Sequence, residues 1–424
     1  MTDSGGTAPN VRHGQPSRRT TLHHVVWELT LRCDLACNHC GSRAGKARAE
    51  ELSTAEALDV VKQLADMGAK EVSLIGGEAY LRDDWCTIIE AIRAAGMMCT
   101  MVTGGRTLTA ERARAAAKAG LQSASVSIDG MAATHDVLRG VPGSFDAALA
   151  AASNLREAGV EISINTQVNR VSFDDLDDVF AIAKARGFHS WQVQLTVPMG
   201  RAADNAEWLL SPDDILDVIP KIGALALAGR SAGVRLWPGN NLGYFGPHED
   251  DLRGRLVKGT HYSGCTAGHR TLGIEADGAI KGCPSLPTNA YTGGNVRDRR
   301  VLDVWQNTRE LSFARDHQVE LWGGCASCYY AKVCRGGCTW TAHVFFARPG
   351  NNPYCHHRAL ELDARGLREH LERTEAPAGL PFDYGCFRLT ELPSRTPEER
   401  GEERRAARAA ALSLRSRRRL EVVS

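Results

Sequence analysis

Ten of the thirteen cysteines in this chain fall into two ordered sets, and this placement restricts the possible folds more than any other feature. The first set reads C-x3-C-x2-C. The second reads C-x17-C and then, after a long gap, C-x2-C-x5-C-x3-C-x16-C. In a reducing compartment, thiols at such spacings indicate metal ligands rather than structural disulfides. Each set must therefore converge in space. The ten residues are Cys33, Cys37, Cys40, Cys265, Cys283, Cys325, Cys328, Cys334, Cys338 and Cys355.

Composition and charge are typical of a globular protein with room for more than one domain. The 424 residues are 43% hydrophobic and 24% charged, with a formal net charge of +1, which gives no indication of nucleic-acid binding. No apolar run of about 18 residues and no signal-peptide core is visible, so we expect a cytoplasmic protein without membrane contact. Cys86 and Cys99 stand apart from both sets, and we expect them to be small buried hydrophobes.

Strand-like runs alternate with helical patterns from His24 onward. This alternation predicts an α/β fold with a parallel sheet and right-handed crossovers, either open or curled into a partial barrel. The expected strands are HHVVWELT, EVSLI, MCTMV, SASVSI, VEISINTQV and WQVQLTV. The expected helices are 54–67, 84–95, 110–119, 144–158, 173–186 and 212–228.

Changes in composition divide the chain into five segments. After about Gly229 the pattern becomes irregular and Gly-rich, and the final stretch is dominated by Arg, Glu and Ala, which predicts a solvated helix or a disordered tail. We therefore expect a flexible arm at 1–21, a barrel at 22–228, a linker at 229–262, a cysteine-rich domain at 263–392 and a charged tail at 393–424.

The first cysteine set directly follows the first expected strand. Three thiolates on one short loop suit an iron–sulfur cubane in which one iron has no protein ligand. A zinc site is the alternative, because His39 lies inside the motif and could supply a fourth ligand. The position after a strand of a β/α series favours the catalytic interpretation.

With these cysteines and the motifs that follow them, the chain resembles the radical S-adenosylmethionine (SAM) superfamily. The resemblance implies a partial (β/α)6 TIM-like barrel, one [4Fe-4S] cluster on the first set, and SAM bound to the open iron. It also implies that SAM is cleaved to a 5′-deoxyadenosyl radical that abstracts hydrogen. The residues implied to bind SAM are Gly76, Gly77 and Glu78 for its amino group, Ser127 and Asp129 for the ribose, and Asn165, Gln167 and Gln194 at the same end of the barrel.

The second cysteine set, with Gly278 five residues before Cys283, is similar to the SPASM domain of such enzymes. That resemblance implies two auxiliary iron–sulfur clusters. The distal cluster would use Cys325, Cys328, Cys334 and Cys355, and the proximal cluster Cys265, Cys283 and Cys338. Some members supply a fourth proximal ligand where this chain has Thr271, so the proximal cluster has an open iron or is completed by His269, Cys386 or a substrate group. A zinc ribbon is the alternative for this set.

The SPASM resemblance implies that the substrate is a ribosomally made precursor peptide, modified by a crosslink, a thioether or an epimerisation. Only about twenty irregular residues precede the barrel, so either a separate leader-recognition protein delivers the peptide or the substrate is not a leader-bearing peptide. The electron donor is expected to be a reductase, a flavodoxin or a ferredoxin. Pro284 stands where sulfatase-maturing relatives have an acid, which disfavours that reaction. A radical enzyme of small-molecule or tetrapyrrole metabolism and a zinc scaffold are the alternatives.

The catalytic groups are less well defined by the sequence. Cys386, in FDYGCFRL, is a candidate hydrogen-atom donor, as in peptide epimerases, or a proximal ligand. Several other residues are candidate acids, bases or radical relays, although a histidine or tyrosine in a core is more often simply hydrogen-bonded. These are Asp129, His135, His261, His269 and Tyr291.

Overall fold

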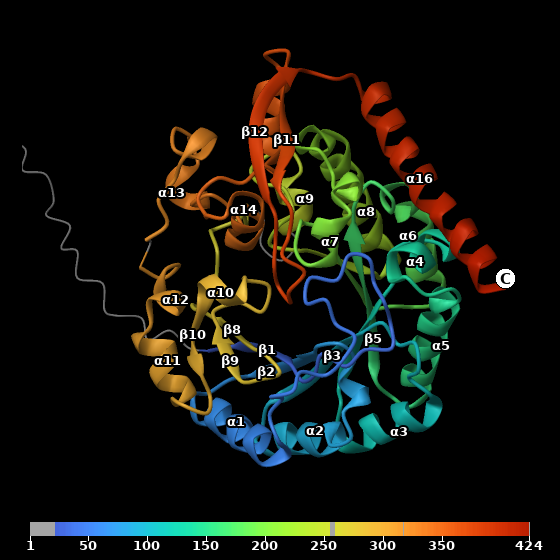
Figure 1. The fold of residues 1–424 in the computed structure, drawn as a ribbon, viewed down its shortest axis with the longest axis vertical. Coiled ribbons are helices and arrows are strands. Elements are labelled where there is room, and N and C mark those ends of the chain that lie inside the picture. Colours follow the sequence, from blue (N-terminus) through green and yellow to red (C-terminus); the bar gives the residue numbers. More distant parts are fainter. Residues whose placement is uncertain (1–21, 255–258, 317, 424) are drawn as a thin grey trace, which may run out of the picture.

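A ten-stranded sheet forms the centre of the computed structural model shown in Figure 1, which describes residues 22–254, 259–316 and 318–423. The strand order is β10-β9-β8-β1-β2-β3-β4-β5-β6-β7. The expected arm at 1–21 lies outside the described residues. The seven consecutive parallel strands are β1 (His24–Glu28), β2 (Glu71–Ile75), β3 (Met98–Thr103), β4 (Ser123–Ser127), β5 (Glu161–Val168), β6 (Ser190–Leu195) and β7 (Arg235–Pro238).

Helices cover the outer face of the curved sheet, and Figure 1 shows α1, α2, α3 and α5 lying in sequence along it. The first of them begins at a capping box formed by Ser53 and Glu56, which satisfies backbone N–H groups at its start. The crossover helices are α1 (Thr54–Asp66), α2 (Trp85–Ala94), α3 (Ala110–Ala119), α4 (Ala132–Arg139), α5 (Ser144–Glu157), α6 (Leu176–Ala185) and α8 (Ile215–Ala232). The sequence predicted all of these except α4. The partial barrel is confirmed.

The segment 229–262 differs from the linker that the sequence predicted. It contains β7, which adds a seventh parallel strand beside β6, and the short helix α9 (Glu249–Arg253). Four residues are too few to show a period-2 pattern, so this strand forms because β6 offers an unpaired edge.

The cysteine-rich segment also contributes to the barrel sheet instead of standing apart as a separate domain. Strand β8 (Thr271–Ile274) pairs parallel with β1, and β9 (Ala279–Lys281) and β10 (Thr292–Asn295) follow antiparallel. The remaining helices of this region are α10 (Thr288–Tyr291), α11 (Val301–Asn307), α12 (Arg309–Ser312), α13 (Ala331–Cys334), α14 (Thr339–Phe346) and α15 (His356–Asp363). Shorter helical turns are α7 (Arg201–Asp204), Ala79–Leu81, Phe173–Asp175, Ala206–Trp208, Pro212–Asp214 and Gly323–Cys325.

A two-stranded hairpin, β11 (Leu367–Glu375) and β12 (Cys386–Pro393), follows the cysteine-rich region. Its connecting loop reaches the mouth of the barrel (Figure 1). There the amide of Phe382 donates to the carbonyl of Gly41 (3.0 Å), and the amide of Gly200 donates to the carbonyl of Asp383 (2.7 Å). The loop therefore lies against the segment that carries the first cysteine set.

The charged tail is a helix, which was one of the two expectations, but it is docked on the barrel rather than surrounded by solvent. Helix α16 (Pro397–Val423) lies along the outside of the barrel (Figure 1). Arg404 pairs with Asp214 (2.7 Å), Arg400 pairs with Asp217 (2.7 Å), and Ala411 is buried against α4. Local sequence shows the arginines, but it does not show the aspartates that they meet. Among the described residues, no helix has both the length and the apolar character needed to cross a bilayer.

Candidate active site and metal centres

The first cysteine set lies on a loop that leaves the carboxyl end of β1, at the edge where all the parallel strands end. The amide of Cys33 donates to the carbonyl of Gly45 (3.0 Å) and closes this loop. Burial raises the pKa of Cys37 to about 11, and the charge of Cys40 adds to the shift. Burial likewise raises the pKa of Cys33, with additional contributions from both other thiols. The three thiols thus disfavour one another's ionisation, and a bound cation would be needed to hold them all as thiolates.

Gly76 and Gly77 allow the end of β2 to approach the cysteine loop closely. A Cβ on Gly76 would lie 2.3 Å from the carbonyl oxygen of Thr30, and a Cβ on Gly77 would lie 2.0 Å from that of Arg32. Gly76 also has a positive φ of +147°, a conformation that glycine adopts without strain. The amide of Gly77 donates to Thr30 (2.6 Å), so the two glycines fix β2 against the loop.

Glu78 follows the two glycines and directs its carboxylate to the same place. It is 2% exposed and accepts hydrogen bonds from the Thr103 hydroxyl and from the amide of Gly104 (2.7 Å). Burial raises its pKa to about 7 although these hydrogen bonds oppose the shift. One oxygen of Glu78, one of Asp34 and the sulfur of Cys33 all lie within 4.8 Å of one another. The donors fit an iron–sulfur centre on the thiols, with a carboxylate beside it that can accept an ammonium group.

The next predicted residues lie side by side at the ends of β4, β5 and β6. Ser127 is in register with Asn165 and donates to its side-chain oxygen (3.2 Å). Gln167 is in register with Gln194, and both side chains are half-buried. The structure thus brings these four polar residues to the same edge of the sheet as Glu78.

Asp129, for which the resemblance implied ribose binding, is enclosed by charged and polar groups of the protein. Its side chain is 0% exposed, and it pairs with Arg139 (2.6 Å) and His39 (3.2 Å) while also accepting from the amide of Gln167 (2.9 Å). Burial alone would raise the pKa of Asp129, but Arg139 and His39 outweigh burial and hold it well below its usual range. Both carboxylate oxygens are therefore already engaged, and the residue acts as the counter-ion of a buried cation.

That cation, Arg139, is a residue that the sequence reasoning missed. It ends α4 and donates toward the sulfur of Cys37 (3.7 Å). The nearby carbonyl of Leu138 accepts from the backbone of Asn38 (2.8 Å) and from Nδ1 of His39 (3.1 Å), so α4 supports the cysteine loop directly. The glycine at 140, which caps α4 with a positive φ in the structure, was the one local signal, and the eight residues of α4 are too few to show a clear helical period. Because both ring nitrogens of His39 are engaged, it does not complete a zinc site with the thiols.

The electrostatic neighbours within the second cysteine set follow the two groups that the SPASM resemblance implied, whose roles as ligands stay a prediction. Burial, with the charges of Cys265 and Cys283, raises the pKa of Cys338 to about 12. We call these three residues the proximal set. Burial likewise raises the pKa of Cys355, and the charges of three other cysteines add to that shift. These four form the distal set, which is Cys325, Cys328, Cys334 and Cys355.

Two tyrosines lie beside cysteines of both the proximal and the distal set. The rings of Tyr244 and Tyr262 are 4.6 Å apart, and the Tyr244 hydroxyl accepts from the amide of Cys338 (3.1 Å). Burial raises the pKa of Tyr244 well above its usual value, and the charges of Cys338 and Cys334 add to the shift. A packed aromatic pair thus lies next to cysteines of both sets.

The other candidate acids and bases have ordinary structural partners. Nδ1 of His135 accepts from the amide of Asp129 (3.1 Å), and burial lowers the pKa of His135 to about 3. His261 is bonded to the carbonyl of Tyr262 (2.9 Å). Cys386 begins β12, close to Tyr384. The choice among His269, Cys386 and a substrate group as fourth proximal ligand stays a prediction.

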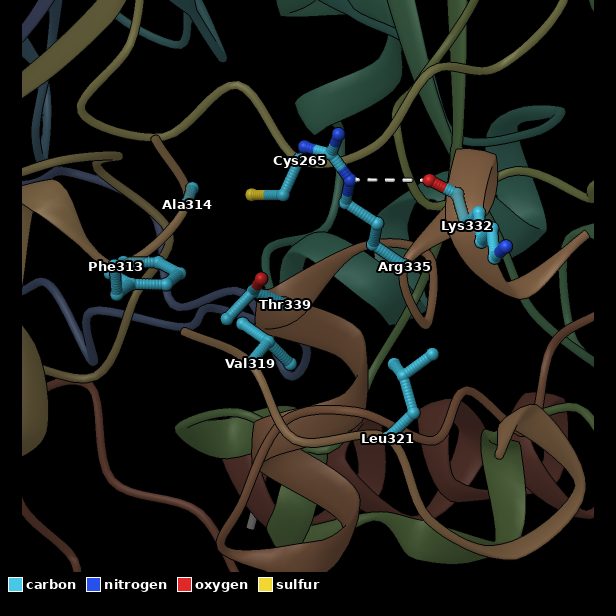
Figure 2. Close-up of a pocket in the computed structure, with 8 residues that line it drawn as sticks. All are labelled: Cys265, Phe313, Ala314, Val319, Leu321, Lys332, Arg335 and Thr339. Atoms are coloured by element: carbon cyan, nitrogen blue, oxygen red, sulfur yellow. Dashed lines mark hydrogen bonds between the residues drawn. The ribbon is translucent and has the colours of Figure 1, made fainter. Parts of the chain in front are cut away.

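A pocket of about 260 Å³ opens beside the proximal set. Figure 2 shows the sulfur of Cys265 at this pocket, together with the ring of Phe313 and the basic side chains of Lys332 and Arg335. Arg335 donates through Nε to the carbonyl of Lys332 (3.4 Å). The pocket combines apolar walls with positive charge next to a predicted metal ligand.

Two family models match the chain. The Radical SAM superfamily model covers residues 27–183, and the SPASM model, described as an iron–sulfur cluster-binding domain, covers residues 265–329. The chain therefore belongs to the radical SAM superfamily and is an enzyme with a SPASM domain. As a member of this superfamily, the chain binds SAM and iron–sulfur clusters.

Curated relatives are similar over most of their length. The chain is 31% identical over 345 residues to the AdoMet-dependent heme synthase of Nitratidesulfovibrio vulgaris, covering 76% of this chain and 89% of the relative. It is 30% identical over 353 residues to the mycofactocin maturase MftC of Mycolicibacterium smegmatis, covering 78% of this chain and 82% of that protein.

Solved structures share the fold. Streptococcus suis SuiB bound to S-adenosylmethionine superposes with a TM-score of 0.61 at 18% identity, covering 79% of this chain and 76% of SuiB. The structure of anSMEcpe with bound AdoMet gives a TM-score of 0.65 at 17% identity, covering 80% of this chain and 95% of that one.

Proposed function

We propose that this enzyme holds three iron–sulfur centres and uses the first to cleave SAM reductively. The proposal is supported by the match to the radical SAM and SPASM family models, together with ten cysteines whose mutual electrostatic effects fall into three groups, one on the loop after β1 and two in the SPASM region. Bound there, SAM and the cluster supply a 5′-deoxyadenosyl radical that abstracts hydrogen from an unactivated C–H bond. We propose [4Fe-4S] clusters throughout, with an external reductase, flavodoxin or ferredoxin as electron donor.

The residues of this chain would hold and orient SAM at the barrel mouth. Cys33, Cys37 and Cys40 would ligate the cluster, and the Glu78 carboxylate would accept the ammonium group of SAM. The four polar residues at the ends of the next strands would orient the nucleoside, and these are Ser127, Asn165, Gln167 and Gln194. The hairpin loop that lies against the cysteine loop would help to exclude water and stray hydrogen donors.

We propose a ribosomally made precursor peptide as the substrate, modified by a crosslink, a thioether or an epimerisation. The similarity to a mycofactocin maturase over 82% of its length supports this choice, as does the resemblance of the second cysteine set to those of peptide-modifying enzymes. A separate leader-recognition protein would deliver the peptide. In an epimerisation, Cys386 would be the hydrogen-atom donor, because it lies next to the loop at the barrel mouth.

A tetrapyrrole substrate is the second candidate, because the chain is equally similar to an AdoMet-dependent heme synthase over 89% of that protein. The basic pocket beside Cys265 is compatible with either substrate, since peptides and tetrapyrroles both carry carboxylates. Stimulation of 5′-deoxyadenosine formation distinguishes the two. A porphyrin that stimulates turnover would refute the peptide proposal, whereas a peptide encoded by a neighbouring gene that does so would support it.

The cluster proposal is tested by anaerobic reconstitution with iron and sulfide, followed by dithionite and SAM. We expect about eleven to twelve iron atoms per chain and formation of 5′-deoxyadenosine measured by mass spectrometry. The Cys33→Ala, Cys37→Ala and Cys40→Ala variants should lose this activity and about four iron atoms. Cys86→Ala is the matched control, because Cys86 lies on α2 outside all three groups. Zinc in place of iron, or no SAM cleavage by fully loaded protein, would refute the proposal.

A further inference from the structure

Three residues from distant parts of the chain form a continuous hydrogen-bonded line. The hydroxyl of Tyr291 lies 3.0 Å from Nδ1 of His343, and Nε2 of the same imidazole lies 3.0 Å from the hydroxyl of Tyr384. Tyr291 ends α10, His343 is in α14, and Tyr384 is in the loop before β12. Tyr291 and His343 are 7% and 6% exposed, so water does not replace their mutual hydrogen bond.

One end of this line lies at the mouth of the barrel. The backbone of Tyr384 pairs with that of Met199, in the segment that follows β6. Two residues earlier, the amide of Phe382 donates to Gly41 on the first cysteine loop. Tyr384 therefore lies on the loop that covers the place where the SAM-derived radical would act.

The other end lies beside the proximal set. After burial, the charge of Cys265 is the next largest cause of the raised pKa of Tyr291. The Tyr291 ring also packs on Phe313, which lines the pocket at Cys265, with ring centroids 5.2 Å apart. The line thus connects the barrel mouth with the proximal set.

We propose that Tyr291, His343 and Tyr384 form a proton relay in which His343 holds the proton that accompanies reduction of the proximal iron–sulfur centre. The inference rests on the proposed function. A neutral imidazole has one N–H and one lone pair, so one tyrosine must donate to it while the other accepts. A change of tautomer reverses both bonds without moving a heavy atom. Burial lowers the pKa of His343 to about 4 and keeps it neutral until negative charge develops nearby.

The transfer is a proton movement without any redox change in the relay itself. A hydronium ion from solvent at the barrel mouth gives its proton to the Tyr384 oxygen and leaves as water, while the Tyr384 hydroxyl proton passes to Nε2 of His343. One bond to hydrogen breaks at the donor and one N–H bond forms, which leaves a positive imidazolium. In the test below, dithionite supplies the matching electron. The titratable groups facing the imidazole are Tyr291 and Tyr384, with Cys265 beyond the first and Cys386 beyond the second.

The test measures the midpoint potential of the proximal centre against pH, by dithionite titration followed by electron paramagnetic resonance. The background protein is the full chain with the triple substitution Cys33→Ala, Cys37→Ala and Cys40→Ala. In this protein only the auxiliary centres contribute to the paramagnetic resonance signal. His343→Gln replaces the imidazole with an amide that can still donate and accept hydrogen bonds but cannot hold a proton. Tyr330→Phe is the matched control, because Tyr330 packs on Phe245 beside the distal set and contacts none of the three relay residues in the described structure.

We expect the potential to fall as pH rises in the background protein and in Tyr330→Phe, and to become independent of pH in His343→Gln. Tyr291→Phe removes one partner of the imidazole and should move the pH at which the curve bends. A flat curve in fully loaded background protein, or the same slope in His343→Gln, would overturn the relay while leaving the proposed function standing. If His343→Gln takes up no iron, Tyr291→Phe decides the matter, and a curve whose bend stays at the background pH would overturn the relay. Protein that takes up no iron at all would refute the proposed function and the relay together.

Discussion

Replacing Gly77 with alanine should displace the cysteine loop without removing any proposed ligand. The alanine Cβ would lie 2.0 Å from the carbonyl oxygen of Arg32 and 2.5 Å from its carbon, whereas ordinary contact begins at 3.4 Å. These are backbone atoms and cannot rotate away, so the loop must move by more than about 1 Å. Such a shift stretches two hydrogen bonds, from Gly77 to Thr30 (2.6 Å) and from Glu78 to Arg32 (2.8 Å).

The loss of these two hydrogen bonds sets the expected size of the effect. Each contributes about 1 to 1.5 kcal/mol net, so together they account for about 2 to 3 kcal/mol. That free energy corresponds to a roughly 30- to 150-fold loss in the population that keeps the loop in place. We therefore expect SAM affinity to weaken by about this factor, because Glu78 moves together with the loop.

Equilibrium dialysis with SAM, on anaerobically reconstituted protein with its iron counted, measures this effect. Gly45→Ala is the matched control: Gly45 belongs to the same loop, but a Cβ there would have no atom within 4 Å. The control should bind SAM like the wild type. If Gly77→Ala also binds SAM with wild-type affinity and a full iron content, the contact between β2 and the loop does not position the site.

Three further changes probe buried charges at different places in the fold. Asp129→Asn leaves Arg139 without its counter-ion and should destabilise the fold by about 3 to 5 kcal/mol. A thermal unfolding midpoint equal to that of the wild type would contradict the role of Asp129 as counter-ion. Arg404→Ala removes the partner of two aspartates and should lower the free energy of unfolding by a similar amount. The control Arg405→Ala, at an exposed position of the same helix, should change it by less than about 0.5 kcal/mol. Equal effects of the two variants would mean that α16 is not docked. Burial raises the pKa of Glu28 to about 8, so the folded state prefers the protonated acid. The stabilisation from Glu28 is therefore complete below about pH 4.5 and is lost as pH rises through 8, and unfolding measured against pH should show that Glu28→Gln abolishes this component.

Local patterns in the sequence predicted most of the barrel. The runs HHVVWELT to WQVQLTV became β1 to β6, because each is long enough to show strand composition and is bounded by turn residues. The expected helices agree with the observed ones to within a few residues at their ends. The short helix α4 and the four-residue strand β7 were missed, since neither is long enough to carry a clear period.

The roles of individual polar residues were harder to predict than the elements that carry them. Asp129 lies at the expected strand end, but its function depends on Arg139, which arrives from a helix that the sequence did not reveal. His343 and Tyr384 showed no motif of their own. They became relevant only because the fold places them in line with Tyr291.

The sequence by itself determined which atoms are available for chemistry and along which elements they lie. Cysteine spacing and strand periodicity are local properties, set by backbone geometry over a few residues, and they can be read without a fold. Only the tertiary structure decided which charges meet: α16 against the acids near α8, Arg139 against Asp129, and the hairpin loop against the cysteine loop. These contacts join residues far apart in the chain, and their free energy depends on burial and geometry that exist only after the sheet and its helices have packed.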